Sequence, residues 1–157
     1  MSKKKVLIPI SDPQFSLQVL PHLQNFLDPE ESELLLLHVE KEPQSIHIER
    51  PLMGSVDIYR DEAEYALRVN FADEMKPVID QLQNEGFDVT TDVLFGKPAQ
   101  AIEEHLAYVP VDMVAITTHG RTGLEKLMAG SVAEHILHHT HIPVLIFHPS
   151  LDDQATL

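Results

Sequence analysis

The chain has 157 residues, a formal net charge of −14 at pH 7 and no cysteine. This length fits one domain with a sizeable core, and the missing cysteines exclude disulfides, thiolate nucleophiles and cysteine zinc sites. The acidic balance argues against nucleic acid or anionic lipid as a partner. The apolar stretch after the first lysines is too short for a secretory signal, and no run is long enough to span a membrane, so we expect a cytoplasmic protein.

The first part of the chain predicts two buried strands with an interrupted helix between them. Val6–Ile10 and Leu34–Val39 are continuous apolar runs, which are typical of strands covered on both faces. Between them, leucines recur at helical spacing from Leu17 to Leu27, and Pro21 predicts a kink or a late start. Lys41–Val56 has no clear periodicity and is expected to form a long loop.

The longest helical pattern runs from about Asp57 to Asn84. Pro77 lies inside it and predicts a break or kink, and Gly86 suits the cap at its end. The face expected to be apolar consists of Tyr65, Val69, Ala72, Met75, Ile79 and Leu82.

The remaining elements alternate between strand and helix. In chain order we expect a strand over Phe87–Phe95, a turn at Gly96–Pro98, a helix over Ala99–Ala107, a strand over Val111–Thr117, a helix from Ser131 and a last strand over Pro143–Phe147. Residues 1–150 are expected to form one domain, and residues 151–157 a disordered tail.

This alternation predicts an α/β fold: a doubly wound sheet of about five parallel strands with helices on both faces. In such sheets, ligands bind at the carboxyl ends of strands, where the strand order reverses. The loops that follow the first, second and fourth strands are therefore the places to look for a site. They hold Pro9–Asp12, Val39–Lys41 and Thr117–Gly130.

The loop after the fourth strand has the residues of a phosphate cradle. Gly120 and Gly123 permit close approach of the backbone. Ser131 is placed to cap the last helix, whose free amides would attract phosphate, and Arg121 is a local cation. An alternative reading stays open, in which the glycines only allow a turn and Ser131 only caps the helix.

This segment resembles the signature of the universal stress protein family, in its ATP-binding branch. That signature is G-x-x-G, nine residues, then G-[ST]; here Gly120 is followed by nine residues, Arg121–Ala129, and by Gly130-Ser131. The resemblance extends from about Val6 to His148. Its other matching segments are Leu36–Val39, Gly96–Pro98, Asp112–Val114, Ser131–Glu134 and Pro143–Leu145.

The resemblance implies a set of ATP contacts, of which those of Val39 and Val132 would be made through the backbone. Pro9 and Ser11 would lie near adenine and ribose, and Val39 would contact adenine. The phosphate loop would contribute His119, Gly120, Arg121, Gly123, Gly130, Ser131 and Val132. A divalent cation such as Mg²⁺ is expected to offset the phosphate charge.

Two positions depart from the family pattern. Thr117 replaces the first glycine of the signature, where its side chain would crowd the nucleotide or donate a hydrogen bond to it. The usual aspartate after the first strand is Ser11 here, so Asp12 takes over its contact or the contact is lost.

The resemblance further implies a regulatory module that forms a homodimer, or a higher homo-oligomer, through the last strand. Some members of the family stand beside membrane transporters of compatible solutes, and the acidity of this chain is similar to theirs. Two alternatives stay open: a nucleotide-free interaction protein of the same fold, and a slow ATP hydrolase or adenylate-transferring enzyme. There is no P-loop, and no base for a fast hydrolase stands out.

The histidine pair His135 and His139, and the single residue His119, each allow more than one interpretation. His135 and His139 have the i, i+4 spacing of metal ligands, but no acidic residue is clearly placed in sequence to join them. We therefore expect a solvated or dimer-facing surface and no metal, with a pH-sensitive patch as an alternative. His119 is expected to order its loop, and a role as general acid or phosphate donor is the alternative.

Overall fold

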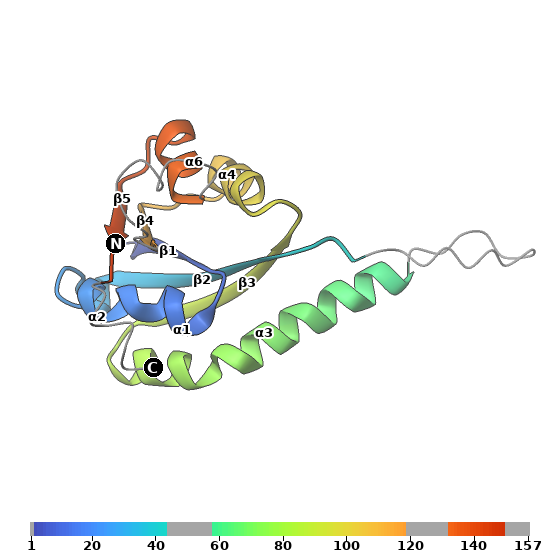
Figure 1. Cartoon of the computed structure of the whole chain (residues 1–157). Coiled ribbons are helices and arrows are strands. Elements are labelled where there is room, and N and C mark those ends of the chain that lie inside the picture. Colours follow the sequence, from blue (N-terminus) through green and yellow to red (C-terminus); the bar gives the residue numbers. More distant parts are fainter. Residues whose placement is uncertain (1, 44–57, 119–131, 150–157) are drawn as a thin grey trace, which may run out of the picture.

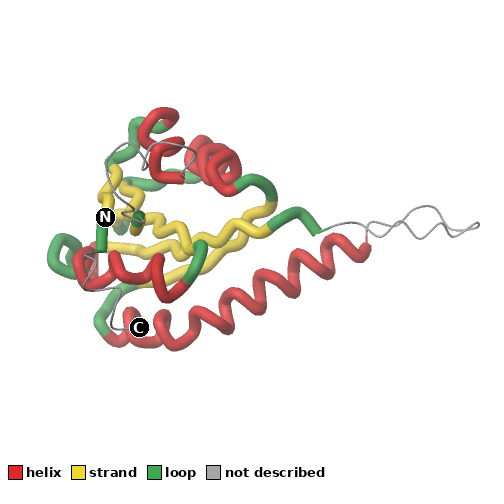
Figure 2. The backbone as a smooth tube through the Cα atoms, viewed as in Figure 1, coloured by secondary structure: helices red, strands yellow, loops and turns green. Residues whose placement is uncertain are grey.

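A computed structural model describes residues 2–43, 58–118 and 132–149. The loop at Lys41–Val56, the glycine-rich loop, Ser131 and the C-terminal tail lie wholly or mostly outside these ranges. The strands are β1 (Lys4–Ile10), β2 (Ser32–Glu40), β3 (Asp88–Phe95), β4 (Met113–Thr117) and β5 (Val144–Phe147). The helical segments are α1 (Pro13–Ser16), η1 (Leu17–Val19), α2 (Leu20–Leu23), η2 (Pro29–Glu31), α3 (Ile58–Asn84), α4 (Pro98–Tyr108) and α6 (Val132–His139) (Figures 1 and 2).

The five strands form one sheet in the order β3-β2-β1-β4-β5, and all neighbouring pairs are parallel. The predicted fold class is thereby confirmed. The chain moves outward from β1 to β2 and β3, and then crosses back to place β4 on the other side of β1. The strand order thus reverses between β1 and β4, which makes their carboxyl ends the expected place for a ligand.

Two helical layers cover the sheet, and β1 shows why both are needed. Its side chains alternate, so that Val6, Ile8 and Ile10 pack into one apolar cluster and Leu7 into the other. The first cluster also holds Phe71 of α3, and the second holds Ile102 of α4 and Ile136 of α6. In Figure 1, α1, α2 and α3 lie on one side of the strands, and α4 and α6 lie on the other.

The first helical pattern is broken, as Pro21 indicates. Asp12 caps α1 by accepting a hydrogen bond from the N–H of Phe15 (3.4 Å), and η1 separates α1 from α2. Pro21 lies in the first turn of α2, where a backbone N–H would make no hydrogen bond within the helix, so proline costs no such bond there. At its far end this segment reaches β5, since the ring of His22 stacks on that of Phe147.

Helix α3 excludes the break that was one of the two effects expected of Pro77, and it corrects part of the predicted apolar face. It continues through Pro77 without a break, and it buries Phe71 while leaving Tyr65 71% exposed and Val69 39% exposed. The second half of the expected face is confirmed, because Met75 and Leu82 are buried. Figure 1 shows that the first turns of α3 extend past the ends of the strands, so their apolar residues have no sheet to cover.

Two glycines end their elements in backbone conformations that other residues rarely adopt. Gly86 has φ 98°, and the N–H of Phe87 reaches back to the carbonyl of Leu82 (3.0 Å), which confirms the predicted cap of α3. Gly96 has φ 123°, and its N–H donates to the carbonyl of Glu40 (2.9 Å). This turn places Pro98 at the start of α4, beside the carboxyl end of β2.

No helix in the described ranges is both long enough and apolar enough to cross a membrane.

Candidate functional site

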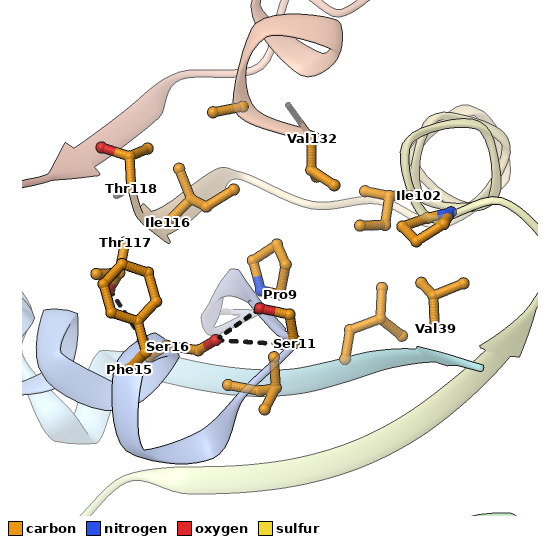
Figure 3. A pocket seen from close by; sticks show the side chains of 14 residues that line it. Pro9, Ser11, Phe15, Ser16, Val39, Ile102, Ile116, Thr117, Thr118 and Val132 are labelled. Atoms are coloured by element: carbon orange, nitrogen blue, oxygen red, sulfur yellow. Dashed lines mark hydrogen bonds between the residues drawn. The ribbon is translucent and has the colours of Figure 1, made fainter. Parts of the chain in front are cut away.

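A cavity of about 310 Å³ lies at the carboxyl ends of β1, β2 and β4, where the strand order reverses. Figure 3 shows its side chains converging from both helical layers, with Phe15 on one side, Ile102 and Val132 on the other, and Pro9 between them. The lining residues are Pro9, Ile10, Ser11, Phe15, Ser16, Leu37, Val39, Pro98, Ile102, Ile116, Thr117, Thr118, Val132 and Ala133.

The lining is mainly aliphatic and carries no charged side chain within the part of the chain that the structure describes. Its polar groups are the hydroxyls of two serines and two threonines, and its one aromatic side chain is that of Phe15. Such a surface suits a flat, weakly polar group such as a nucleobase, and it offers nothing to neutralise a phosphate. The charged part of a nucleotide would therefore need a different set of partners.

Ser11 and Ser16 form a hydroxyl pair at the edge of the cavity. The N–H of Ser11 donates to Oγ of Ser16 (3.1 Å), and the two Oγ atoms lie 3.4 Å apart (Figure 3). Asp12 is outside the lining, because its carboxylate caps α1. At the predicted aspartate position the cavity therefore presents a serine hydroxyl, which can both donate and accept.

Thr117 lines the cavity, but its hydroxyl is already engaged inside the fold. Oγ1 of this buried residue donates to the carbonyl of Ser16 (3.0 Å) and thereby ties the end of β4 to the end of α1. The two effects considered for Thr117 were crowding of a ligand and donation to it. In this geometry the hydroxyl proton is used within the fold and stabilises the wall of the cavity, while the side chain remains part of the lining.

The structure brings together Pro9, Ser11, Val39, Thr117 and Val132, which the sequence places in separate segments. The other predicted contacts, His119, Gly120, Arg121, Gly123, Gly130 and Ser131, lie outside the described residues. Sequence reasoning missed Phe15, Ile102 and Ile116, because nothing in an apolar residue of a helix or strand distinguishes cavity lining from core. The family pattern could have drawn attention only to the ends of the strands.

A second cavity of about 220 Å³ lies on the α3 side of Ser11 and is lined by His38, Glu40 and Phe71, among others. Nδ1–H of His38 donates to the carbonyl of Ile10 (2.7 Å), and the ring stacks on Phe71. The backbone N–H of Lys41, followed by the side chain of His38, lowers the pKa of Glu40 below its ordinary value. This cavity thus presents a carboxylate and would repel a phosphate, unlike the first one.

A doubly wound parallel sheet with a cavity at its switch point defines the class: an α/β domain of the kind in which ligands bind beyond the carboxyl ends of the strands. The model of the universal stress protein family matches residues 3–148. The chain belongs to the universal stress protein family.

Universal stress protein MJ0577 of Methanocaldococcus jannaschii is 28% identical over 151 residues, which cover 91% of this chain and 93% of the relative. Its solved structure superposes with a TM-score of 0.68 at 25% identity and covers 96% of this chain and 99% of the other.

Two solved structures of the same fold contain an adenine nucleotide. A universal stress protein in complex with cAMP has a TM-score of 0.61 at 16% identity, and covers 96% of this chain and all of its own. A family member from Arabidopsis thaliana with AMP bound has a TM-score of 0.57 at 19% identity, covering 96% of this chain and 94% of its own.

Proposed function

We propose that this protein binds ATP, or a related adenine nucleotide, in the cavity at the carboxyl ends of β1 and β4, and works as a regulatory module. The observation that carries the proposal is the cavity itself. It is apolar and uncharged in its described lining, it lies at the switch point, and it collects Pro9, Ser11, Val39, Thr117 and Val132. The AMP and cAMP complexes support the proposal because the same fold accommodates adenine nucleotides in those two proteins.

The polarity of the cavity suggests how the nucleotide is oriented. Adenine would pack between Val39 and Ile102, where only aliphatic groups and backbone surround it. The ribose would then meet the hydroxyls of Ser11 and Ser16. The phosphates would extend toward the start of α6, where Val132 begins the helix and the signature residues Gly130-Ser131 precede it. Mg²⁺ would offset their charge in a chain of net charge −14.

A regulatory role fits this site better than fast catalysis. The described lining holds no carboxylate, histidine or lysine that could activate a water molecule. We infer that nucleotide binding biases a conformation or an oligomer that a partner recognises. Slow hydrolysis that depends on His119, in the loop outside the described residues, is the enzymatic alternative.

The proposal is tested by blocking the cavity. Val132→Trp adds a large ring at the start of α6, where Figure 3 shows the Val132 side chain pointing into the cavity. Leu137→Trp is the matched control, because Leu137 lies on the same helix and is 51% exposed. In calorimetric titrations with Mg-ATP, ADP and AMP, Val132→Trp should weaken binding by about tenfold or more, and Leu137→Trp should leave it unchanged.

The purified protein is also heat-denatured and the supernatant analysed by chromatography for released nucleotide. Released adenine nucleotide, together with the contrast between the two variants, would support the proposal. No released nucleotide and no binding at millimolar concentrations would overturn it and favour the nucleotide-free interaction protein.

We also propose that the chain forms a homodimer through β5. This strand pairs only with β4 in the described sheet, so one of its edges is open, and its Ile146 is 42% exposed. Ile146→Lys should shift a sedimentation-velocity boundary from dimer to monomer. A monomeric wild-type boundary at micromolar concentration would contradict the dimer. Regulation of a compatible-solute transporter, and a cytoplasmic location, stay predictions that rest on the sequence.

A further inference from the structure

The face of the protein formed by α4 and α6 carries a cluster of three potential metal ligands. Glu103 lies on α4, and His135 and His139 lie one turn apart on α6, which packs against it. The helix pairing thus supplies the acidic residue that the sequence does not place beside the two histidines. One ligand atom of each residue lies within 4.8 Å of the others.

The side chains of this cluster already face one another. Nε2 of His135 contacts Oε2 of Glu103. The rings of His135 and His139 stack with centroids 4.0 Å apart and an interplanar angle of 17°. Two imidazoles this close would repel each other if both were protonated, but as neutral rings both can coordinate one cation.

A hydrogen bond to the backbone orients the ring of His139 for metal coordination. Nδ1–H of His139 donates to the carbonyl of His135 (2.8 Å), which leaves Nε2 as the ring nitrogen with a free lone pair. Metal-binding histidines ordinarily have their second nitrogen held in this way, because the bond fixes the tautomer and the ring orientation. His138, also on α6, has no place in the cluster and is exposed.

We propose that Glu103, His135 and His139 bind a divalent transition-metal ion of the Zn²⁺ type. Two imidazole nitrogens and one carboxylate oxygen are a donor set that Zn²⁺ accepts, and harder cations such as Mg²⁺ prefer oxygen alone. The cluster is partly exposed, so water completes the coordination shell, and the net charge of −14 favours a cation.

The ion would link α4 and α6, two helices that line the ligand cavity. Glu103 follows the lining residue Ile102, and His135 lies within a turn of Val132 and Ala133. Metal that binds only the folded protein raises its melting temperature. This proposal is independent of nucleotide binding, since the cluster is complete without the cavity.

The test uses the full chain stripped with a chelator and then titrated with Zn²⁺ against a chromophoric competitor. We expect one saturable site per chain. His139→Ala and Glu103→Gln should each weaken it by about tenfold or more. The matched controls are His138→Ala and Glu104→Gln, which alter exposed neighbours on the same two helices and should leave the affinity unchanged. Zn²⁺ should raise the melting temperature of the wild type and of the controls only.

Co²⁺ provides a second readout, because a His/His/Glu site should give the intense visible absorption of a low-coordinate ion. This spectrum needs only the wild-type protein, so it stands even where a variant does not fold. Equal losses in the cluster variants and the controls would mean that Zn²⁺ binds the many surface histidines, and would overturn the proposal. So would a Co²⁺ spectrum of the hexaaqua type.

Discussion

Leu36→Ala should lower the free energy of unfolding by about 3–5 kcal/mol, and Leu37→Ala by about 2–3 kcal/mol. These residues are neighbours on β2, both fully buried, and they point to opposite faces of the sheet. Removal of the Leu36 side chain leaves a closed void under α3, whereas removal of the Leu37 side chain enlarges the existing cavity at the carboxyl ends of the strands. An enlarged cavity can admit water, so its cost is nearer to the transfer free energy alone.

Urea unfolding of both variants, followed by circular dichroism, measures this difference. The paired design is its own control, since the two substitutions remove the same atoms from adjacent positions in one strand. A larger loss for Leu37→Ala than for Leu36→Ala would mean that the space beside Leu37 is closed and dry. That result would also weaken the case for the cavity as a ligand site.

Pro77→Ala should raise the free energy of unfolding by about 1–3 kcal/mol. Pro77 lies inside α3 and is exposed, so the substitution disturbs no core contact. Alanine restores an N–H that can donate to the carbonyl of Asp73 one turn earlier, and it removes the clash of the proline ring with that carbonyl. The helix is continuous here, so its tertiary contacts must offset the local cost of the proline.

The control for this prediction is Pro98→Ala, the same substitution in the first turn of α4. There the missing N–H has no helical partner, so stability should change by less than about 1 kcal/mol. The midpoints and slopes of urea unfolding curves measure both effects. If Pro77→Ala stabilised the protein no more than Pro98→Ala does, or destabilised it, α3 would have a local geometry around Pro77 into which alanine does not fit.

Local sequence signals were sufficient for the elements and for the fold class. The apolar runs at Val6–Ile10 and Leu34–Val39 predict buried strands, and alternation with helical patterns leaves few arrangements other than a doubly wound sheet. Pro21 and Gly86 also act as predicted, because proline and glycine restrict or permit the same backbone angles wherever they occur.

Predictions that depended on tertiary contacts were less accurate. The periodicity of α3 put Tyr65 and Val69 in the core, yet both are exposed, since an apolar stripe is buried only where another element lies opposite it. Pro77 was expected to break or kink the helix; the helix is not broken, because Met75 and Leu82 pack against the sheet on either side of the proline. The same limit applies to the cavity, whose residues Phe15, Ile102 and Ile116 come from three different elements.

The sequence by itself determined where the strands and helices lie, that the sheet is parallel, and which loop carries the family signature. For the histidines in the described ranges, only the tertiary structure decided which lie near other groups and which face solvent. His105 is partly buried, and this burial lowers its pKa below the ordinary value, whereas His135 contacts Glu103 across the α4–α6 pair. Periodicity reports backbone geometry over a few residues, but burial and ligand distance depend on atoms far apart in the chain, which only folding brings together.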